Sequence, residues 1–322
     1  MNAAAPDYAQ EIQRSAREIL ARTASTEGLL ERLRAEDVSR GAWDAAAQAG
    51  WFRLLSGEAA GGLGAGPAEL AALFREIGRH LAAGPWVDTV VAAGLLRDHA
   101  DLGPDTALIG YLPEPGAVVE FAAVADVLVV RGPDSIGLAR GALAMPLKSF
   151  DLAGRPAQVD LTGATVEAVV EGAEAERVAV AIARLARVAR SGELAGLAAA
   201  ALDMSVRYAG ERVQFDRPIG AFQAVQHRIA EMAVTRTAVD SALAAIVTLA
   251  ASEGTDAEQA ALYEYAAGEA RTVVLSALQV HGGIGFSAEH PLHAYIKRVL
   301  RLQAVAGEGE PLLDLGGRLL AG

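Results

Sequence analysis

The chain has 322 residues, of which 52% are hydrophobic, 21% charged and 5% aromatic, and its formal net charge is −12. This composition supports a sizeable core and more helix than sheet, and it argues against a nucleic-acid-binding protein, which usually has a basic surface. Because the chain has no cysteine, disulfides, thiolate metal ligands and a cysteine nucleophile are excluded.

Residues 1–102 are predicted to form an N-terminal helical domain. Its start, MNAAAPDYAQEIQRSAR, is polar and charged and lacks the apolar stretch typical of a secretion signal. Ile12, Ala16 and Leu20 lie on one face of the first predicted helix. Pro67 opens a further amphipathic helix, AELAALFREIGRHLA.

The pattern changes over residues 103–176. Short apolar or alternating runs (ALIGYLP, DVLVVRG, ALAMPL, AQVDLTG) are bounded there by glycine, proline and aspartate. This spacing is typical of strands and predicts a small β domain, which is short for a sheet that must hold a large ligand.

Residues 177–322 are predicted to form a C-terminal four-helix bundle. The predicted helices are GELAGLAAAALDMSVRYAGERVQF, AFQAVQHRIAEMAVTRTAVDSALAAIVTLAAS, DAEQAALYEYAAGEARTVVLSALQVHGG and PLHAYIKRVLRLQAVAG, with short connections. The longest uncharged apolar run, SALAAIVTLAAS, is too short to span a bilayer, so we expect a cytoplasmic protein that does not act at a membrane. The expected fold is therefore mainly α with a small β domain.

Two turns of the predicted bundle have the residues of a phosphate site. In RVQFDRPIGAF, Arg212 stands at a helix end, where its planar guanidinium suits phosphate oxygens; the alternative is an ordinary charged helix end. In QVHGGIGF, Gly282 and Gly283 allow a pyrophosphate to approach the backbone N–H groups; the alternative is a tight helix-ending turn. No strand precedes these glycines, so they are not a Rossmann fingerprint.

Three stretches resemble the acyl-CoA dehydrogenase family: RVQFDRPIGAFQAVQHRIAEM, ALQVHGGIGFSAEHPLHAYIKR and GWFRLLSGEAAGGLGAGPAELAALFREIGRHLAAGPW. They follow the family's order and spacing over nearly the whole chain. The resemblance implies a helical N-terminal domain, a β-barrel-like middle domain and a C-terminal four-helix bundle. It also implies an FAD cofactor that lies across a dimer interface and an acyl-CoA substrate.

In the family, the bundle of one subunit contacts the adenosine diphosphate half of the neighbour's FAD. Carried over, the resemblance assigns these contacts to Arg212, Gln214, Phe215, Gln279, Gly282 and Gly283. Asp216 is a departure, since the family usually has glycine there and a carboxylate slightly disfavours a nearby phosphate.

The flavin side of the family's site is missing from this sequence. Between 103 and 176 there is no Thr-Glu-Pro-x-Ala-Gly-Ser-like loop and no Trp-x-x-Asn-Gly-like strand. One family position for the catalytic base corresponds to Ala306, with Glu308 two residues later as a weak candidate, and the other corresponds to Ala186. Glu193 lies elsewhere on that helix, and we expect it to be structural.

Two further assignments depend on the resemblance or on spacing. Arg187 matches an arginine that contacts the acyl-CoA substrate in some relatives, although a solvated charge among the bundle arginines is the alternative. His290 and His293 have a spacing that metals use, but Pro291 between them marks a helix start, and we expect no metal site.

The leading hypothesis is a subunit of a heteromeric, FAD-dependent acyl-CoA dehydrogenase, an α2β2 assembly in which a second subunit supplies the flavin cradle and the base. The resemblance implies steroid-type CoA thioesters as substrates and a role in lipid or steroid degradation. The alternatives are a self-sufficient homo-oligomeric dehydrogenase that uses Glu308 and a non-catalytic scaffold on the same fold.

Overall fold

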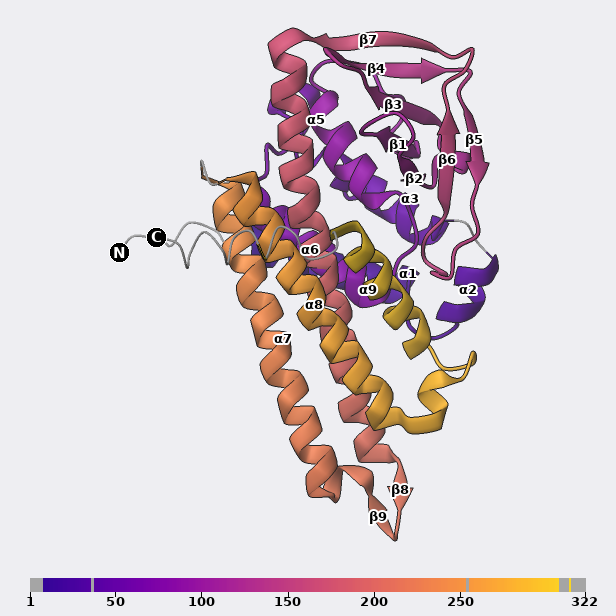
Figure 1. Ribbon diagram of the computed structural model, residues 1–322, viewed down its shortest axis with the longest axis vertical. Coiled ribbons are helices and arrows are strands. Elements are labelled where there is room, and N and C mark those ends of the chain that lie inside the picture. Colours follow the sequence, from indigo (N-terminus) through magenta and orange to yellow (C-terminus); the bar gives the residue numbers. More distant parts are fainter. Residues whose placement is uncertain (1–7, 36–37, 253–254, 307–312, 314–322) are drawn as a thin grey trace. The chain divides into compact units, whose positions relative to one another are not determined.

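The structure is a computed structural model that describes residues 8–35, 38–252, 255–306 and 313. Helices dominate it (Figure 1). The α-helices are α1 Tyr8–Thr23, α2 Leu29–Ala35, α3 Arg40–Gln48, α4 Pro67–His80, α5 Gly94–Leu96, α6 Gly172–Glu211, α7 Gln223–Ala250, α8 Asp256–His281 and α9 Leu292–Ala306. The strands are β1 Ile109–Leu112, β2 Val118–Glu120, β3 Val127–Arg131, β4 Ser135–Arg140, β5 Leu143–Pro146, β6 Pro156–Asp160, β7 Thr165–Glu171, β8 Val213–Gln214 and β9 Arg217–Pro218.

The predicted fold class, mainly α with a small β domain, is confirmed. The first bundle helix differs from its prediction at both ends. α6 already begins at Gly172, directly after β7, and it ends at Glu211, so that Arg212 to Phe215 leave the helix for a β-hairpin. Two consecutive residues with left-handed backbone, Phe215 and Asp216, make the turn of this hairpin.

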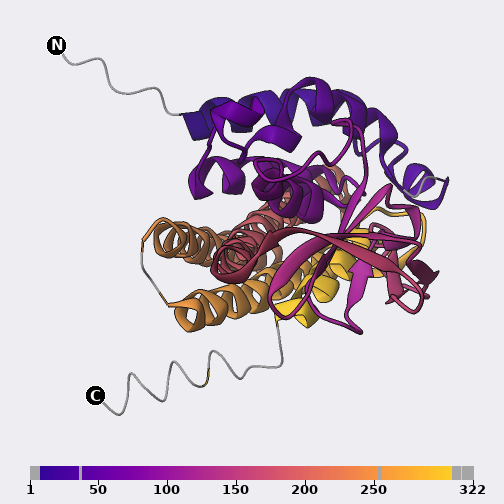
Figure 2. The same ribbon diagram turned by 90° about the horizontal axis from the view of Figure 1, so that it is seen from above.

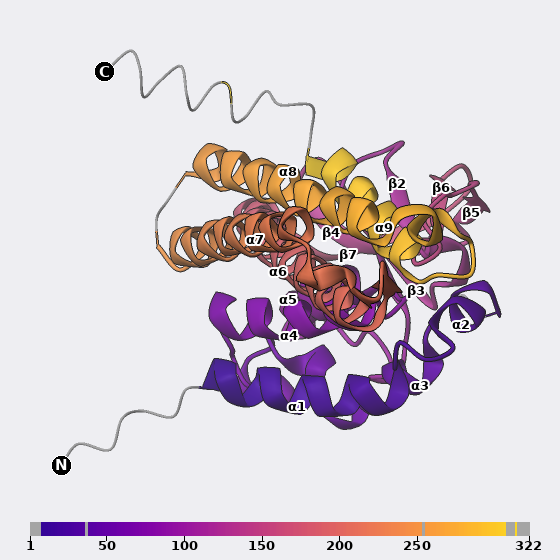
Figure 3. The same cartoon turned by 90° about the horizontal axis from the view of Figure 1, so that it is seen from below.

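The chain forms two compact units, which are described separately. The first comprises the described residues within 1–30, 67–81 and 187–322. In it, α1 packs on α4, α7 on α8 and α8 on α9. Figures 1 and 3 both show α7 and α8 lying side by side along most of their length.

Local sequence explains how the helices of this unit begin and how closely they pack. Thr255 caps α8: its hydroxyl accepts the N–H of Glu258, and the Glu258 carboxylate accepts the N–H of Thr255. Where α4 meets α6, Gly78 and Gly196 have no side chain, and a Cβ on either would overlap the backbone of the other helix. Glycine at these positions therefore permits direct backbone contact between the helices.

The second unit comprises the described residues within 31–66 and 82–186 and contains the strands β1 to β7. One sheet has the order β1-β3-β4-β7, with β1 and β3 parallel, and the other has the antiparallel order β2-β6-β5. Figure 2 shows these strands, in magenta, gathered in one region and strongly twisted. The strands lie within the range predicted for the middle domain.

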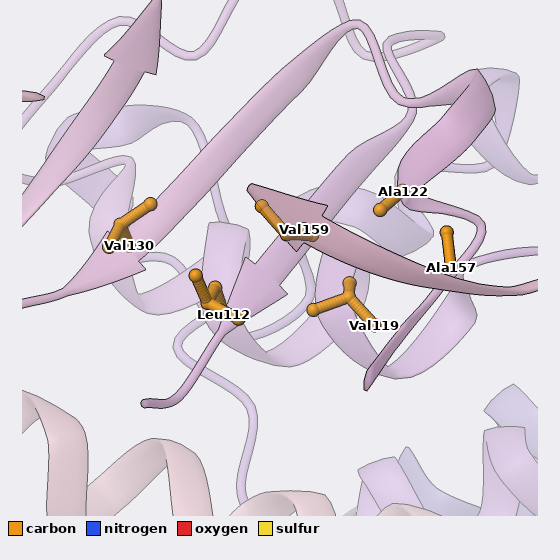
Figure 4. Packing of buried hydrophobic residues seen from close by; sticks show 6 residues of the cluster. All are labelled: Leu112, Val119, Ala122, Val130, Ala157 and Val159. Carbon is orange, nitrogen blue, oxygen red and sulfur yellow. The ribbon is translucent and has the colours of Figure 1, made fainter. Parts of the chain in front are cut away.

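Small apolar side chains form the core between the two sheets. The buried residues are Leu112, Val119, Ala122, Val130, Ala157 and Val159 (Figure 4). Ala122 belongs to a 3₁₀ turn, Ala122–Val124, and the others come from strands of both sheets. Ala157 and Val159 alternate along β6, as expected for a sheet with one buried face.

By length and composition alone, α7 is long and apolar enough to cross a membrane, although only 28% of its most apolar stretch is buried. A single helix of this kind is weak evidence for a membrane span, because the core helices of many globular proteins have the same composition. The run SALAAIVTLAAS lies at the end of this helix, within the stretch predicted as the second helix of the bundle.

Candidate functional site

The Arg212 turn is a β-hairpin at the end of α6. The N–H of Arg212 donates to the carbonyl oxygen of Tyr208 at 2.9 Å, which completes the helix. Gln214 then pairs with Arg217 across the hairpin. The turn residues Phe215 and Asp216 have φ of 52° and 62°, a left-handed conformation that short polar side chains tolerate and that a phenylalanine rarely adopts. The local backbone therefore fits the family's preference for glycine beside Phe215.

This hairpin projects past the ends of α6 and α7 (Figure 1). Arg212, Gln214 and Phe215 are all exposed, and 86% of the Phe215 surface is accessible. The guanidinium of Arg217 lies 4.0 Å from the centre of the Phe222 ring, which supports the base of the hairpin by a cation–π contact. The tip thus presents an arginine and an aromatic ring to a surface outside this chain.

The glycine turn, Gly282–Phe286, is a 3₁₀ turn that follows α8. Gly282 has φ 59° and ψ −140°, a combination essentially restricted to glycine. A Cβ at Gly282 or Gly283 would meet no atom within 4 Å, whereas one at Gly285 would lie 3.0 Å from Leu278. Gly285 is therefore needed for packing within the chain, while the backbone of Gly282 and Gly283 is open to an outside group. Gln279 is exposed on the last turn of α8.

The two turns lie at the same end of α6 and α8 (Figure 1). They are joined by an aromatic contact: the ring of Tyr208 on α6 stacks on the imidazole of His281 at the end of α8, with centroids 4.6 Å apart and planes 20° apart. The structure thus brings the Arg212 turn and the Gln279 turn into one region of the same unit, as the resemblance implies.

A cavity of about 600 Å³ lies beside this contact, and Tyr208, His281 and His290 are among the residues that line it. Burial lowers the pKa of His281 and, together with the nearby His281 and His293, that of His290. Both imidazoles are therefore neutral at neutral pH. Among the described residues, no group of three or more metal-ligating side chains lies together.

The remaining candidate residues have partners within the chain or lie outside the described residues. Arg187 lies 3.4 Å from the side-chain oxygen of Gln259 and 3.7 Å from the carboxylate of Asp256, both at the start of α8. Glu193 accepts hydrogen bonds from Arg298, which agrees with a structural role. Glu308 lies outside the described residues.

Sequence reasoning missed some of these contacts. His227, in a stretch predicted as a bundle helix, is exposed on α7, and so is Ala224 near it. Tyr208 and His281 were not expected to contact one another. The contact could have been predicted from their positions in the sequence. Tyr208 lies one helical turn before Arg212 and His281 directly before Gly282, and rings at the ends of neighbouring helices can meet.

Comparison with known proteins identifies the family to which this chain belongs. Residues 6–101 match the model of the acyl-CoA dehydrogenase N-terminal domain, and residues 171–320 match that of the acyl-CoA dehydrogenase C-terminal domain. Acyl-CoA dehydrogenase IpdE2 of Mycolicibacterium smegmatis is 32% identical over 257 residues, which cover 78% of each chain. The chain therefore belongs to the acyl-CoA dehydrogenase family, a family of FAD-dependent oxidoreductases.

Three further comparisons extend over most or all of the chain. Acyl-CoA dehydrogenase FadE27 of Mycobacterium tuberculosis is 28% identical over 331 residues, covering 87% of each chain. The solved Tcur3481-Tcur3483 steroid ACAD is 26% identical, with a TM-score of 0.83 and 97% of each chain covered. The ChsE4-ChsE5 complex from Mycobacterium tuberculosis shares the fold, with 23% identity, a TM-score of 0.80, and 100% of this chain and 99% of that chain covered.

Proposed function

We propose that this chain is one subunit of a heteromeric acyl-CoA dehydrogenase and that it contributes the adenosine-side contacts to an FAD held mainly by a partner subunit. The observation that carries the proposal is the outward-facing geometry of the two turns. Arg212 and Phe215 project from the hairpin, and the backbone of Gly282 and Gly283 is open.

The chemistry of these residues fits the adenosine diphosphate half of FAD. A pyrophosphate bound away from water needs a cation and N–H donors. Arg212 would supply the cation and the glycine turn would offer the N–H of Gly283, since the N–H of Gly282 already donates to the carbonyl oxygen of Leu278. The exposed side-chain amide of Gln279 would add a hydrogen bond, and Phe215 would cover an apolar part of the cofactor. Asp216 opposes this arrangement through its charge.

Exposed apolar residues support a partner subunit. Phe286 is 70% exposed on the glycine turn, and Val234 is 73% exposed on α7. Large apolar side chains on one end and one face of a helical unit are typical of surfaces that another chain covers. The solved relative at 26% identity, the Tcur3481-Tcur3483 steroid ACAD, has a name that pairs two proteins. We infer a second acyl-CoA dehydrogenase subunit, in an α2β2 assembly, and a steroid-type CoA thioester as substrate.

The carboxylates of this chain indicate which subunit would provide the catalytic base. Dehydrogenation needs a carboxylate that removes the α-proton of the acyl thioester. Glu193 is held by Arg298 in the helix interior, so it is not free to take that proton. We infer that the partner supplies the base, with Glu308 as the base in the alternative of a self-sufficient enzyme. FAD, when bound, would provide the acceptor for the hydride that leaves the β-carbon. Arg187, near the start of α8, remains a candidate for contact with the CoA moiety.

The test is the visible flavin absorbance of the chain purified alone and co-purified with an acyl-CoA dehydrogenase-like chain encoded beside it. We expect a colourless chain alone and a yellow complex. In the complex, Arg212→Met should lower the flavin content, whereas Arg228→Met, which changes an exposed arginine on α7, should not.

Three outcomes contradict the proposal in different ways. A yellow chain alone, with one flavin per chain, would show a self-sufficient enzyme and would direct attention to Glu308. A complex that stays colourless would favour the non-catalytic scaffold. Equal flavin content in the Arg212→Met and Arg228→Met complexes would place the cofactor elsewhere.

A further inference from the structure

The ring contact between Tyr208 and His281 lies directly beneath both turns. Tyr208 is one helical turn before Arg212 and accepts the N–H of Arg212 on its carbonyl oxygen. His281 is the last residue of α8 and directly precedes Gly282, whose N–H donates to the carbonyl oxygen of Leu278. Each ring therefore belongs to the helical turn from which one of the two loops departs.

His281 is held firmly in its position. It is only 3% exposed, and its Nδ1–H donates to the carbonyl oxygen of Ala277 at 2.8 Å, which fixes the tautomer because a carbonyl can only accept. The glycine turn wraps around the imidazole: a Cβ on Gly285 would lie 3.1 Å from the Cβ of His281, and the His290 ring lies 4.8 Å away.

The opposite nitrogen of His281 has no such anchor. Nε2 is buried and has no hydrogen-bond partner among the described residues. The hydrogen bond at Nδ1 limits rotation about the Cβ–Cγ bond, and packing against the ring faces holds the plane of the imidazole further. The nearly parallel ring of Tyr208, with planes only 20° apart, is the face against which the imidazole rests.

Each turn has contacts of its own, and the ring contact links the bases of the two. At the hairpin the Arg217 guanidinium lies on the Phe222 ring, and in the glycine turn Gly285 packs on Leu278. The hairpin has only two residues in each strand, and an isolated pair of this length is marginally stable. The side chains of Val213, Phe215, Ile284 and Phe286 are exposed. The Tyr208–His281 contact therefore lies where it can relate the direction of one turn to that of the other.

We propose that the Tyr208–His281 stack couples the Arg212 turn to the glycine turn, so that both are positioned as one element. Tyr208 and His281 are positioning residues, since they act through the turns that they support. The purpose of the coupling, presenting a cation and the open backbone of the glycine turn at one fixed separation to a diphosphate, rests on the proposed function. The coupling itself is a property of this chain.

Amide hydrogen exchange of the full chain alone tests the coupling. Tyr208→Leu removes the ring and keeps apolar bulk, and it should speed exchange at residues 282–286 as well as at 212–218, by about two- to tenfold, the usual worth of an aromatic pair. Tyr208→Phe should restore the protection of both segments. The matched control is Tyr265→Leu, a partly exposed tyrosine on α8, which should leave both segments unchanged.

The reciprocal variant is His281→Leu, for which amide exchange is measured at the hairpin, residues 212–218. It keeps the test valid if Tyr208→Leu fails to fold. Faster exchange at 212–218 supports the coupling. Changes confined to the segment next to the substituted residue, in either variant, overturn it.

Flavin retention by the co-purified complex separates this inference from the proposed function. If Arg212→Met releases flavin, Tyr208→Leu should also release it and Tyr208→Phe should retain it. Release by Arg212→Met with full retention by Tyr208→Leu overturns the positioning role. If neither variant releases flavin while exchange changes in both segments, the coupling stands and the proposed cofactor contact fails.

Discussion

Arg298 on α9 donates two hydrogen bonds to the carboxylate of Glu193 on α6, at 2.6 and 3.2 Å, and both side chains are nearly buried. The pair joins α9 to α6 at a point where both side chains have little access to water. A salt bridge within the bundle therefore accounts for the buried glutamate.

Glu193→Gln should destabilise the first unit by about 3–5 kcal/mol, because it leaves the Arg298 guanidinium buried without its counter-charge. The double variant Glu193→Leu with Arg298→Met should recover most of that loss, since no unpaired charge remains. Urea denaturation measures both, with Glu231→Gln, an exposed glutamate on α7, as the control. A loss below about 1 kcal/mol for Glu193→Gln would show that the pair is solvated, as surface pairs are.

Gly196 and Gly210 both lie on α6 but differ in the space around them. A Cβ on Gly196 would overlap the carbonyl oxygen of Arg75 on α4, whereas a Cβ on Gly210 would meet nothing. Gly196→Ala should therefore lower the stability of the first unit by about 1–3 kcal/mol or more through overpacking. Gly210→Ala should raise it by about 0.5–1 kcal/mol, because alanine is the better helix former. Thermal unfolding of the two variants checks this, and equal effects would contradict the close contact of α4 with α6.

The fold could be predicted from the sequence because its signals are periodic. Apolar spacing gave the helices, and Pro67, Thr255 and Gly282 mark helix ends by their backbone chemistry. The start of α6 was missed because the residues from Gly172 to Glu176 carry no strong cap and follow a strand directly. Pairings between strands that are distant in the sequence, such as those within the two sheets, leave no periodic pattern from which they could be predicted.

The candidate site could be predicted only in part. Arg212, Gln279 and the two glycines are predicted as cofactor contacts because they stand in short motifs that resemble those of the family, and these contacts stay a prediction. The pairing of Tyr208 with His281 was not found, because two rings separated by two whole helices meet only when those helices are packed. The hairpin at Phe215 was likewise not predicted, because the helical pattern of the sequence continues into RVQF.

Stability should fall as the pH drops below about 6.5, the pKa of a histidine in an unfolded chain. Burial lowers the pKa of His80, His281 and His290 in the folded chain. Between the lowered and the ordinary value the unfolded chain binds more protons, so the contribution is complete above the ordinary pKa and is lost on acidification.

His281→Phe isolates one part of this dependence. Phenylalanine keeps a ring against Tyr208 but does not titrate, so the decrease in Tm between about pH 7.5 and about pH 5.5 should become smaller than in the unchanged chain. His227→Gln, an exposed histidine on α7, should leave the decrease as it was. An unchanged decrease in His281→Phe would mean that His281 is hydrated in solution.

Asp216 combines a left-handed backbone, φ 62°, with a negative charge at the tip of the hairpin. Asp216→Asn keeps the tolerance for this conformation and removes the charge. If the hairpin contacts a diphosphate, the complex should hold flavin more tightly, by up to about tenfold, because a unit charge near a protein surface is worth about 1–2 kcal/mol at a separation of about 10 Å. Flavin release from the complex, followed by fluorescence, measures the effect at low and at high salt.

Asp216→Glu is the matched control, because it keeps the charge but fits the left-handed turn less well. It should hold flavin no more tightly than the unchanged chain, and the advantage of Asp216→Asn should shrink in high salt, since the attraction and repulsion of exposed charges are screened. Identical flavin release from the unchanged chain and from both variants, at low salt, would mean that Asp216 lies far from any phosphate. The hairpin would then reach across the subunit interface for a contact with protein, and Phe215 would be its anchor.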